Sequence, residues 1–138
     1  MENRAKLKFI ELENMVFTLN DSVKLVFDNT DVRLERALRD SVIQRFEYSI
    51  EWIWKFLKYY LLENYWEEAE FSKEVLKKAY KANLIDDLSL YIDMINKRNR
   101  LSHDYHEDFA KLSFDTIIEE YLDEINNFIN KFSKKYDK

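Results

Sequence analysis

The stretch NKRNRLSHDYHED, residues 96–108, gathers most of the side chains in this chain that could do acid–base or phosphate chemistry. It contains both histidines of the protein, together with Arg98 and Arg100. An imidazole can accept or donate a proton near neutral pH, and a guanidinium can hold a phosphate through two hydrogen bonds. Arg98 and His103 are therefore candidates for a catalytic pair acting on a phosphate ester, with Asn99 as a candidate to orient the phosphate or His103.

The helix expected to carry this stretch changes character along its length. At 100° per residue, one line along the helix holds Leu88, Ile92 and Ile95 and then continues with Asn99 and Ser102. A helix that only packed into a core would continue with apolar residues. The polar end is therefore expected either to face a partner or to line a cleft at one end of the fold.

Several of these side chains also have purely structural explanations. Arginine and histidine near a helix C-terminus interact favourably with the helix dipole, and asparagine can satisfy the last carbonyl groups. Lys97, Arg100, Ser102 and Asp104 are candidate contacts to RNA or a nucleotide, although exposed charges in a turn usually only face solvent. His106 is expected to be an ordinary loop residue.

The composition excludes several kinds of site. The 138-residue chain has no cysteine, which removes thiolate metal ligands and thiol nucleophiles, and no glycine, which removes the loops that cradle nucleotide phosphates. No metal site is expected, because the two histidines are three residues apart in a turn and no carboxylate is fixed beside them. The net charge of −5 argues against non-specific coating of nucleic acid, so an RNA contact needs a local basic patch.

A single domain covering residues 1–138 is the simplest organisation, because a chain of this length can bury a core of its own. No apolar run approaches the roughly 20 residues that cross a bilayer, and the N-terminus is charged throughout. We therefore expect a soluble, cytoplasmic protein with no membrane partner and no cofactor.

Apolar spacing predicts an all-α protein, an antiparallel bundle of about five helices with a four-helix up-and-down core. The expected helices span residues 2–27, 32–63, 72–82, a segment that begins at Asp86 or Asp87, and 113–132. Asp31 and Ser72 are expected to cap the second and third helices. Asn83 should end the third helix, because asparagine tolerates left-handed backbone angles better than any residue except glycine.

The segment WIWKFLKYY, residues 52–60, places aromatic side chains on nearly every face of the second helix. One core cannot use all of them, which favours a helix–helix interface with a homodimer as the first candidate. Aromatic residues interleaved with lysines could instead stack nucleic acid bases, a weaker interpretation without a basic surrounding.

Three segments together resemble a known family. The octamer RNRLSHDY (98–105) resembles the RNxxxHxY signature of HEPN domains encoded beside a minimal nucleotidyltransferase (MNT), a family often described as nucleotidyltransferase substrate-binding proteins. Residues 37–61 and 74–87 are similar to two further segments of that family, so the resemblance covers about residues 30–110. Asn83 stands where glycine is usual, a change within the residues that accept the left-handed conformation.

The resemblance implies a helical bundle that dimerises and acts as the toxin of a toxin–antitoxin pair by cleaving RNA, and not DNA, without a metal ion. His103 would exchange a proton with the ribose hydroxyl or the leaving oxygen, and Arg98 would hold the scissile phosphate. One histidine cannot be acid and base at once, so a two-fold interface that supplies a second copy makes chemical sense.

Tyr105 has a different role by the same resemblance. In the HxY version of the family, the MNT antitoxin is thought to transfer AMP to this tyrosine. Bulky, negatively charged nucleotides there would obstruct an RNA phosphate beside Arg98. The structural alternative is a tyrosine whose ring packs over the helix end.

Two other functions remain open at this point. The chain could be a non-catalytic subunit that presents substrate or nucleotide to a separate nucleotidyltransferase, using the same cleft. It could also be an assembly partner in which the motif is only the end of a helix.

Overall fold

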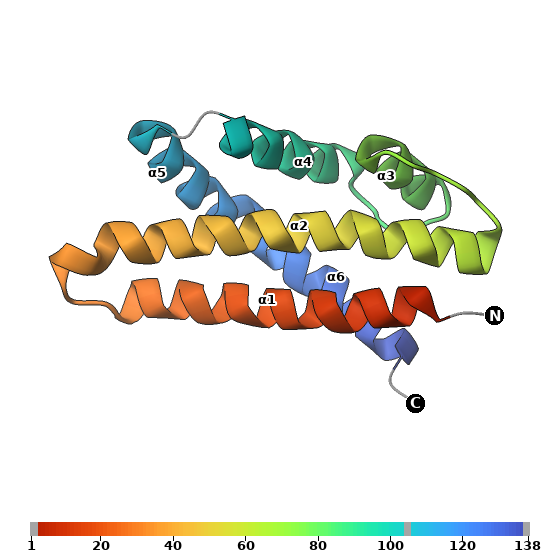
Figure 1. Ribbon diagram of the computed structural model, residues 1–138, viewed down its shortest axis with the longest axis horizontal. Coiled ribbons are helices and arrows are strands. Elements are labelled where there is room, and N and C mark those ends of the chain that lie inside the picture. The colour runs from red at the N-terminus through yellow and green to blue at the C-terminus, as the bar shows by residue number, and fades with distance from the viewer. Residues whose placement is uncertain (1–2, 104–105, 137–138) are drawn as a thin grey trace.

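The structure is a computed structural model that describes residues 3–103 and 106–136. Within these residues the chain is helical apart from short connections (Figure 1). The elements are α1 (Arg4–Asp28), η1 (Val32–Leu34), α2 (Glu35–Tyr65), α3 (Ser72–Lys81), α4 (Leu88–His103), α5 (Glu107–Thr116), η2 (Ile117–Tyr121) and α6 (Leu122–Tyr136).

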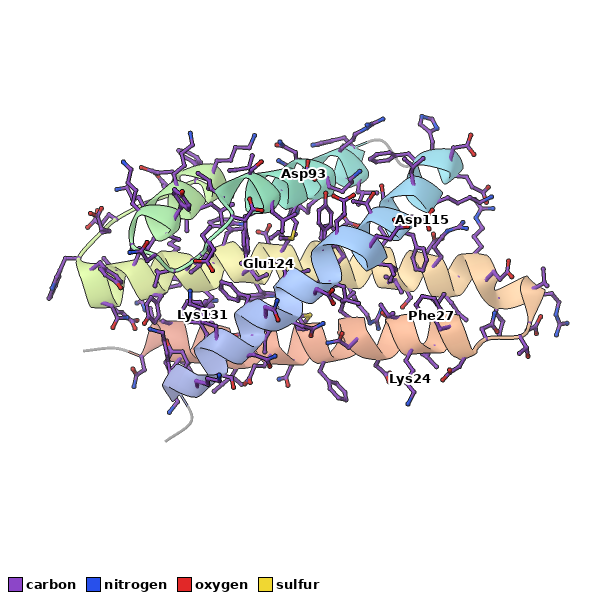
Figure 2. All side chains as sticks on the ribbon, turned by 180° about the vertical axis from the view of Figure 1, so that it is seen from behind. Lys24, Phe27, Asp93, Asp115, Glu124 and Lys131 are labelled. Carbon is purple, nitrogen blue, oxygen red and sulfur yellow. The ribbon has the colours of Figure 1, made fainter. Side chains whose placement is uncertain are left out.

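Helices α1 and α2 form a long antiparallel hairpin, and α4 and the α5–α6 rod complete an up-and-down arrangement around it (Figure 1). The α5–α6 rod crosses α1 and α2 diagonally, as the view from behind shows (Figure 2). The short α3 packs against α2 and α4 at one end. The predicted fold class, an all-α antiparallel bundle of about five helices with a four-helix core, is confirmed.

The connection between α1 and α2 follows from its polar residues. The Asp31 side chain accepts a hydrogen bond from the backbone N–H of Arg33, so Asp31 caps the short 3-10 turn that leads into α2, as predicted. At the other end of the hairpin, the Glu63 carboxylate accepts from the backbone N–H groups of Arg4 and Ala5 at 2.9 and 3.2 Å. A side chain of α2 thereby satisfies the free amides at the start of α1.

The end of α3 is a Schellman motif. Asn83 has a φ of 61°, the Leu84 N–H donates to the Ala79 carbonyl, and the Asn83 N–H donates to the Tyr80 carbonyl. The prediction for Asn83 is confirmed. The prediction for Ser72 is wrong, because α3 already includes Ser72 and its N-cap is Phe71, which makes no side-chain capping bond.

The start of α4 lies within two residues of the predicted position. Asp87 directly precedes the helix and its carboxylate accepts from the Leu90 N–H at 3.0 Å. The last helical rod is longer than the predicted 113–132, because it begins at Glu107 and continues to Tyr136. It also contains the π-helical turn η2, which the apolar spacing did not predict.

The core is one cluster of buried apolar side chains drawn from every long helix. Phe56 of α2 lies at its aromatic centre, with ring centroids 5.3 Å from Phe9 of α1 and 5.0 Å from Phe132 of α6. The apolar side chains of α2 at helical spacing are buried from Val42 to Leu61, whereas Leu34, in the turn before the helix, is exposed.

Polar pairs hold the helices at fixed positions along one another. The Asn20 and Asn126 amides exchange two hydrogen bonds between α1 and α6, at 2.8 and 3.0 Å. The Tyr91 hydroxyl of α4 donates to Glu124 of α6 at 2.6 Å, and burial together with this carboxylate raises the pKa of Tyr91. Glu124 faces α4 in the view of Figure 2.

None of the helices in the described part of the chain combines the length and the apolar character that crossing a bilayer requires.

Candidate functional site

The last two turns of α4 run beside the middle of α2, and this packing decides which motif residues point inward. Tyr91, Ile95, Arg98 and Ser102 share an arc of about 60° at 100° per residue, and the first two are buried. Arg98 and Ser102 therefore continue the side of α4 that faces α2. Asn99, in contrast, lies on the exposed side.

Arg98 is held against α2 by an ion pair. Its Nη2 lies 2.9 Å from Oε1 of Glu51, and its Nη1 donates to Oδ1 of Asn99 at 3.2 Å. The Arg98 side chain keeps 32% of its surface exposed. Glu51 itself pairs with Lys55 at 3.2 Å and accepts from the Trp54 indole N–H at 3.2 Å. The guanidinium is thus fixed in position while one edge remains open to solvent.

Ser102 contacts a second carboxylate of α2. Its hydroxyl lies 3.3 Å from Oε2 of Glu47 and 3.1 Å from the Arg98 carbonyl oxygen. Half-burial raises the pKa of Glu47, while the Ser102 hydrogen bond and the charge of Arg98 act in the opposite direction. Two carboxylates spaced four residues apart on α2 therefore face the motif.

Neither Glu47 nor Glu51 was among the residues expected from the sequence. Both interrupt the apolar segment FEYSIEWIW of α2, at a spacing that puts them on one face of the helix. Acidic residues at this spacing are common on solvated helix faces. Their role depends on the packing of α4 on α2, which the sequence spacing alone does not reveal.

Lys97 and Arg100 cover an aromatic ring of the next helix. The Lys97 ammonium lies 5.2 Å and the Arg100 guanidinium carbon 3.9 Å from the ring centroid of Phe109 on α5. These are cation–π contacts that help to dock the start of α5 on the end of α4. Their expected contact with RNA stays a prediction.

The two histidines occupy neighbouring helix ends. His103 is the last residue of α4 and is exposed. His106 is the N-cap of α5, where its backbone carbonyl accepts from the Ala110 N–H at 2.8 Å. Asp104 and Tyr105, the predicted contact and the predicted AMP acceptor, lie outside the described residues.

The geometry brings some of the predicted site together. Arg98, Asn99, Ser102 and His103 lie on two consecutive turns. Arg98 and Ser102 bond to carboxylates of α2, while Asn99, Ser102 and His103 are all exposed. Such a surface can offer an oriented guanidinium and a solvent-accessible imidazole to a phosphate group. In the described residues, no group of three or more histidine, aspartate or glutamate side chains is arranged to hold a metal ion.

Comparisons with known proteins extend over nearly the whole chain. The family described as "Nucleotidyltransferase substrate binding protein like" matches residues 7–134. No curated protein matches this sequence.

Solved structures share the fold. A protein of Thermus thermophilus superposes with a TM-score of 0.70 and 27% identity, over 92% of this chain and 99% of that one. A chain from the complex of the tri-AMPylated Shewanella oneidensis HEPN toxin with MNT antitoxin gives a TM-score of 0.74 and 17% identity, over 97% and 99%.

A third similar structure comes from Haemophilus influenzae and is described as revealing the fold of a substrate binding domain of a nucleotidyltransferase. It gives a TM-score of 0.61 and 24% identity, over 94% of this chain and 96% of that chain. At these identities the last two likenesses concern the fold.

Proposed function

Because the chain belongs to the family of nucleotidyltransferase substrate binding protein like domains, we propose that it is the HEPN subunit of a two-component toxin–antitoxin pair. In this proposal it acts as a dimer, cleaves RNA without a metal ion, and is neutralised by a partner minimal nucleotidyltransferase. The fold likeness to a HEPN toxin complex supports the same pairing.

The observation that carries the proposal is the exposed end of α4. His103 is in solvent five residues beyond an arginine that Glu51 already holds in place at 2.9 Å. At 100° per residue the two side chains lie about 140° apart around α4, so the proposed reaction draws on two protomers. Pre-positioned charge of this kind stabilises a pentavalent phosphate more effectively than a mobile side chain does.

The proposed reaction uses two copies of His103. Neutral His103 of one protomer takes the proton of the ribose 2′-hydroxyl, and the oxygen attacks the adjacent phosphorus. The bond from phosphorus to the 5′-oxygen breaks, and the partner's His103, in its protonated form, gives its proton to that oxygen. The products are a 2′,3′-cyclic phosphate and a 5′-hydroxyl, while Arg98 offsets the charge on the phosphate oxygens.

Neutralisation would occur at Tyr105. The phenolic oxygen attacks the α-phosphorus of ATP on the partner enzyme, pyrophosphate leaves, and the phenol proton passes to solvent. The AMP would add a bulky, negatively charged group within the motif and so would obstruct an RNA phosphate beside Arg98.

The test is RNA cleavage by the purified protein in the presence of EDTA, read by electrophoresis and by the chemistry of the new ends. We expect cyclic phosphate and 5′-hydroxyl ends, and a loss of at least about 100-fold in rate in His103→Ala. Lys24→Ala, an exposed lysine of α1 labelled in Figure 2, is the matched surface control. Cleavage that survives in folded His103→Ala would refute the mechanism.

The dimer is tested by dilution. If two protomers build each site, the cleavage rate per chain falls once the protein concentration drops below the dissociation constant of the dimer. Sedimentation at the same concentrations should show the monomer appearing in step. A rate per chain that is constant through the transition to monomer would exclude a shared site.

A second function is favoured by one specific contact. Arg98 is already neutralised by Glu51, which weakens it as an anion site in the free protein. A non-catalytic subunit that presents substrate or nucleotide to a separate nucleotidyltransferase needs no free guanidinium. Absence of cleavage, together with nucleotide binding that persists in Arg98→Ala, would support this module in place of the ribonuclease.

A further inference from the structure

Cations and aromatic rings alternate along the surface where α1 and α2 pack together. The Lys8 ammonium lies 4.5 Å from the ring centroid of Trp52 and 5.8 Å from that of Tyr59. The Lys55 ammonium lies 5.2 Å from Trp52, and the Arg4 guanidinium carbon lies 5.8 Å from Tyr59. We name these five residues the cation–aromatic track.

The track is continuous with the candidate site. Glu51 binds Arg98 at 2.9 Å through one oxygen and Lys55 at 3.2 Å through the other. From Glu51 to Tyr59 the helix rises about 12 Å, at 1.5 Å per residue. A chain-like ligand that leaves Arg98 in this direction therefore passes Trp52 and Lys55 before it reaches Tyr59.

The track is partly open to solvent. None of its five residues is fully buried, and Arg4 is exposed. The α5–α6 rod crosses one face of the α1–α2 hairpin and leaves the other face without a helix over it (Figures 1 and 2). Ring faces and ammonium groups are thus within reach of a ligand from solvent.

The local charge contrasts with that of the whole chain, which is −5. Arg4, Lys8 and Lys55 lie over the two rings, and Lys55 is at the same time paired with Glu51. Glu51 is bound by Arg98 and Lys55, and Glu63 accepts from the backbone amides at the start of α1. A two-fold contact of the track with itself would bring like charges together. The partner that fits is an anion.

We propose that the cation–aromatic track binds single-stranded RNA and guides it to Arg98. This inference rests on the proposed function and names the form of the substrate. Single strands expose the faces of their bases, and grooves that combine cations with aromatic rings bind them with little dependence on sequence. In a duplex, the base faces are already stacked inside the helix.

Binding exchanges one set of contacts for another. A base that stacks on Trp52 takes the ring face that Lys8 now covers, and the ammonium moves to the neighbouring phosphate on its flexible stem. No bond is made or broken in this step. Lys8 thereby gains an ion pair with the phosphate, and the base gains stacking area on Trp52.

The experiment is fluorescence anisotropy of a labelled 12-nucleotide RNA of mixed sequence, measured in a His103→Ala background so that cleavage does not interfere. We expect the single strand to bind at least tenfold more tightly than the duplex of the same sequence. Lys8→Ala should lower the slope of log affinity against log salt by about 0.7, the value for one phosphate contact on a single strand. Trp52→Leu should weaken binding by at least about fivefold.

Lys24→Ala is the control, since it removes the same charge from an exposed position of α1 and has no part in the track. Lys8 is a surface residue, so Lys8→Ala keeps the test valid if Trp52→Leu fails to fold. Equal affinity of Lys8→Ala and Lys24→Ala for the single strand overturns the inference, as does equal binding of single strand and duplex.

Two further outcomes separate the track from the proposed function. If the wild type cleaves RNA and Lys8→Ala does not change binding, the ribonuclease proposal is kept and RNA binding by the track is refuted. If Lys8→Ala weakens binding of the single strand but the wild type does not cleave RNA, RNA binding by the track is kept and the ribonuclease proposal is refuted. Binding to vesicles of anionic lipid, lost in Lys8→Ala and without RNA binding, would also overturn the inference.

Discussion

Arg98 shows how one side chain can be both a functional candidate and a structural link. Its ion pair with Glu51 joins α4 to α2, and the same guanidinium is the group that would receive a phosphate. A phosphate must therefore compete with a carboxylate for Arg98. The ion pair fixes the position of the guanidinium and lowers its affinity for other anions.

Glu51→Gln tests this competition. Replacing the carboxylate by an amide removes the competing charge, so we expect RNA affinity in the His103→Ala background to rise about threefold to fivefold, within the range of a partly exposed ion pair. Glu13→Gln, on the exposed side of α1, removes the same charge elsewhere and controls for net charge. Lower affinity in Glu51→Gln than in Glu13→Gln would instead mean that Glu51 serves mainly to position Arg98.

Glu47 predicts a pH dependence of stability. Its pKa is raised by half-burial, so the folded state holds its proton more tightly than the unfolded chain does. Stability therefore falls as pH rises from the ordinary pKa of glutamate through the raised one, and this loss persists at neutral pH. Glu47→Gln keeps an acceptor for Ser102 but removes the titration.

The measurement is urea unfolding of the wild type and Glu47→Gln at pH 7 and pH 4. We expect the variant to be the more stable protein at pH 7, and the difference in the free energy of unfolding to shrink at pH 4, where more of Glu47 is protonated. If the stability advantage of Glu47→Gln over the wild type instead grows on acidification, the ionised carboxylate stabilises the fold.

The motif residues could be found from the sequence because their types and spacing lie within one helix. Arg98, Asn99 and His103 needed only a helical period and a chemical reason. Glu47 and Glu51 lie about 50 residues away in the chain, and only the packing of α4 on α2 brings them to the site. Residue spacing within one helix could not predict which side chains of another helix would contact it.

At the scale of elements, the turn after α3 depends on one residue, Asn83, that tolerates a left-handed backbone conformation. Its φ of 61° is costly for a residue with a Cβ atom, and asparagine reduces that cost relative to alanine. Its backbone carbonyl also accepts from Lys131 of α6 at 3.3 Å. The turn therefore fixes α3 relative to the last helix.

Asn83→Ala should lower the free energy of unfolding by about 1 kcal/mol, and Asn83→Gly should leave it within about 0.5 kcal/mol of the wild type. Lys77→Ala, an exposed change in right-handed helix, is the control. Urea denaturation of the three variants measures the difference. Equal stability of the alanine and glycine variants would contradict a strained turn.

The predicted elements were most accurate where apolar residues recur regularly. Helices α1 to α4 begin or end within a few residues of their expected limits. The first part of the last rod was missed because EDFAKL, residues 107–112, is too short to show a helical period. There the helix is supported by tertiary contacts, including the two cations over Phe109.

At the scale of the whole molecule, one aromatic cluster joins the hairpin to the diagonal rod. Phe56 contacts Phe9 of α1 and Phe128 and Phe132 of α6, so a single ring connects three helices. The class of the fold could be predicted because such a core needs helices that present apolar stripes. Which rings meet is decided by crossing angles that the stripes do not encode.

Phe56→Ala should therefore destabilise the protein by about 3–5 kcal/mol, a large share of the total for a domain of this size. Phe27→Ala removes an equal ring that is 67% exposed, and is expected to change stability by less than about 0.5 kcal/mol. Chemical denaturation followed by circular dichroism compares the two. A similar cost for both variants would mean that Phe56 is not central to the core.

The π turn η2 has a consequence for the gene as well as for the fold. A π turn uses one residue more than an α turn, so η2 resembles a single inserted codon that the rod has absorbed. Deleting one codon within Ile117–Tyr121 would convert η2 to a regular α turn and leave the later residues on the same face of the rod. Asn126 would still face Asn20, and their paired amides would be kept. A one-codon deletion in a regular α-helical turn of the rod would instead rotate everything after it by about 100°. We therefore expect this turn to be the part of the rod that best tolerates the loss of one codon.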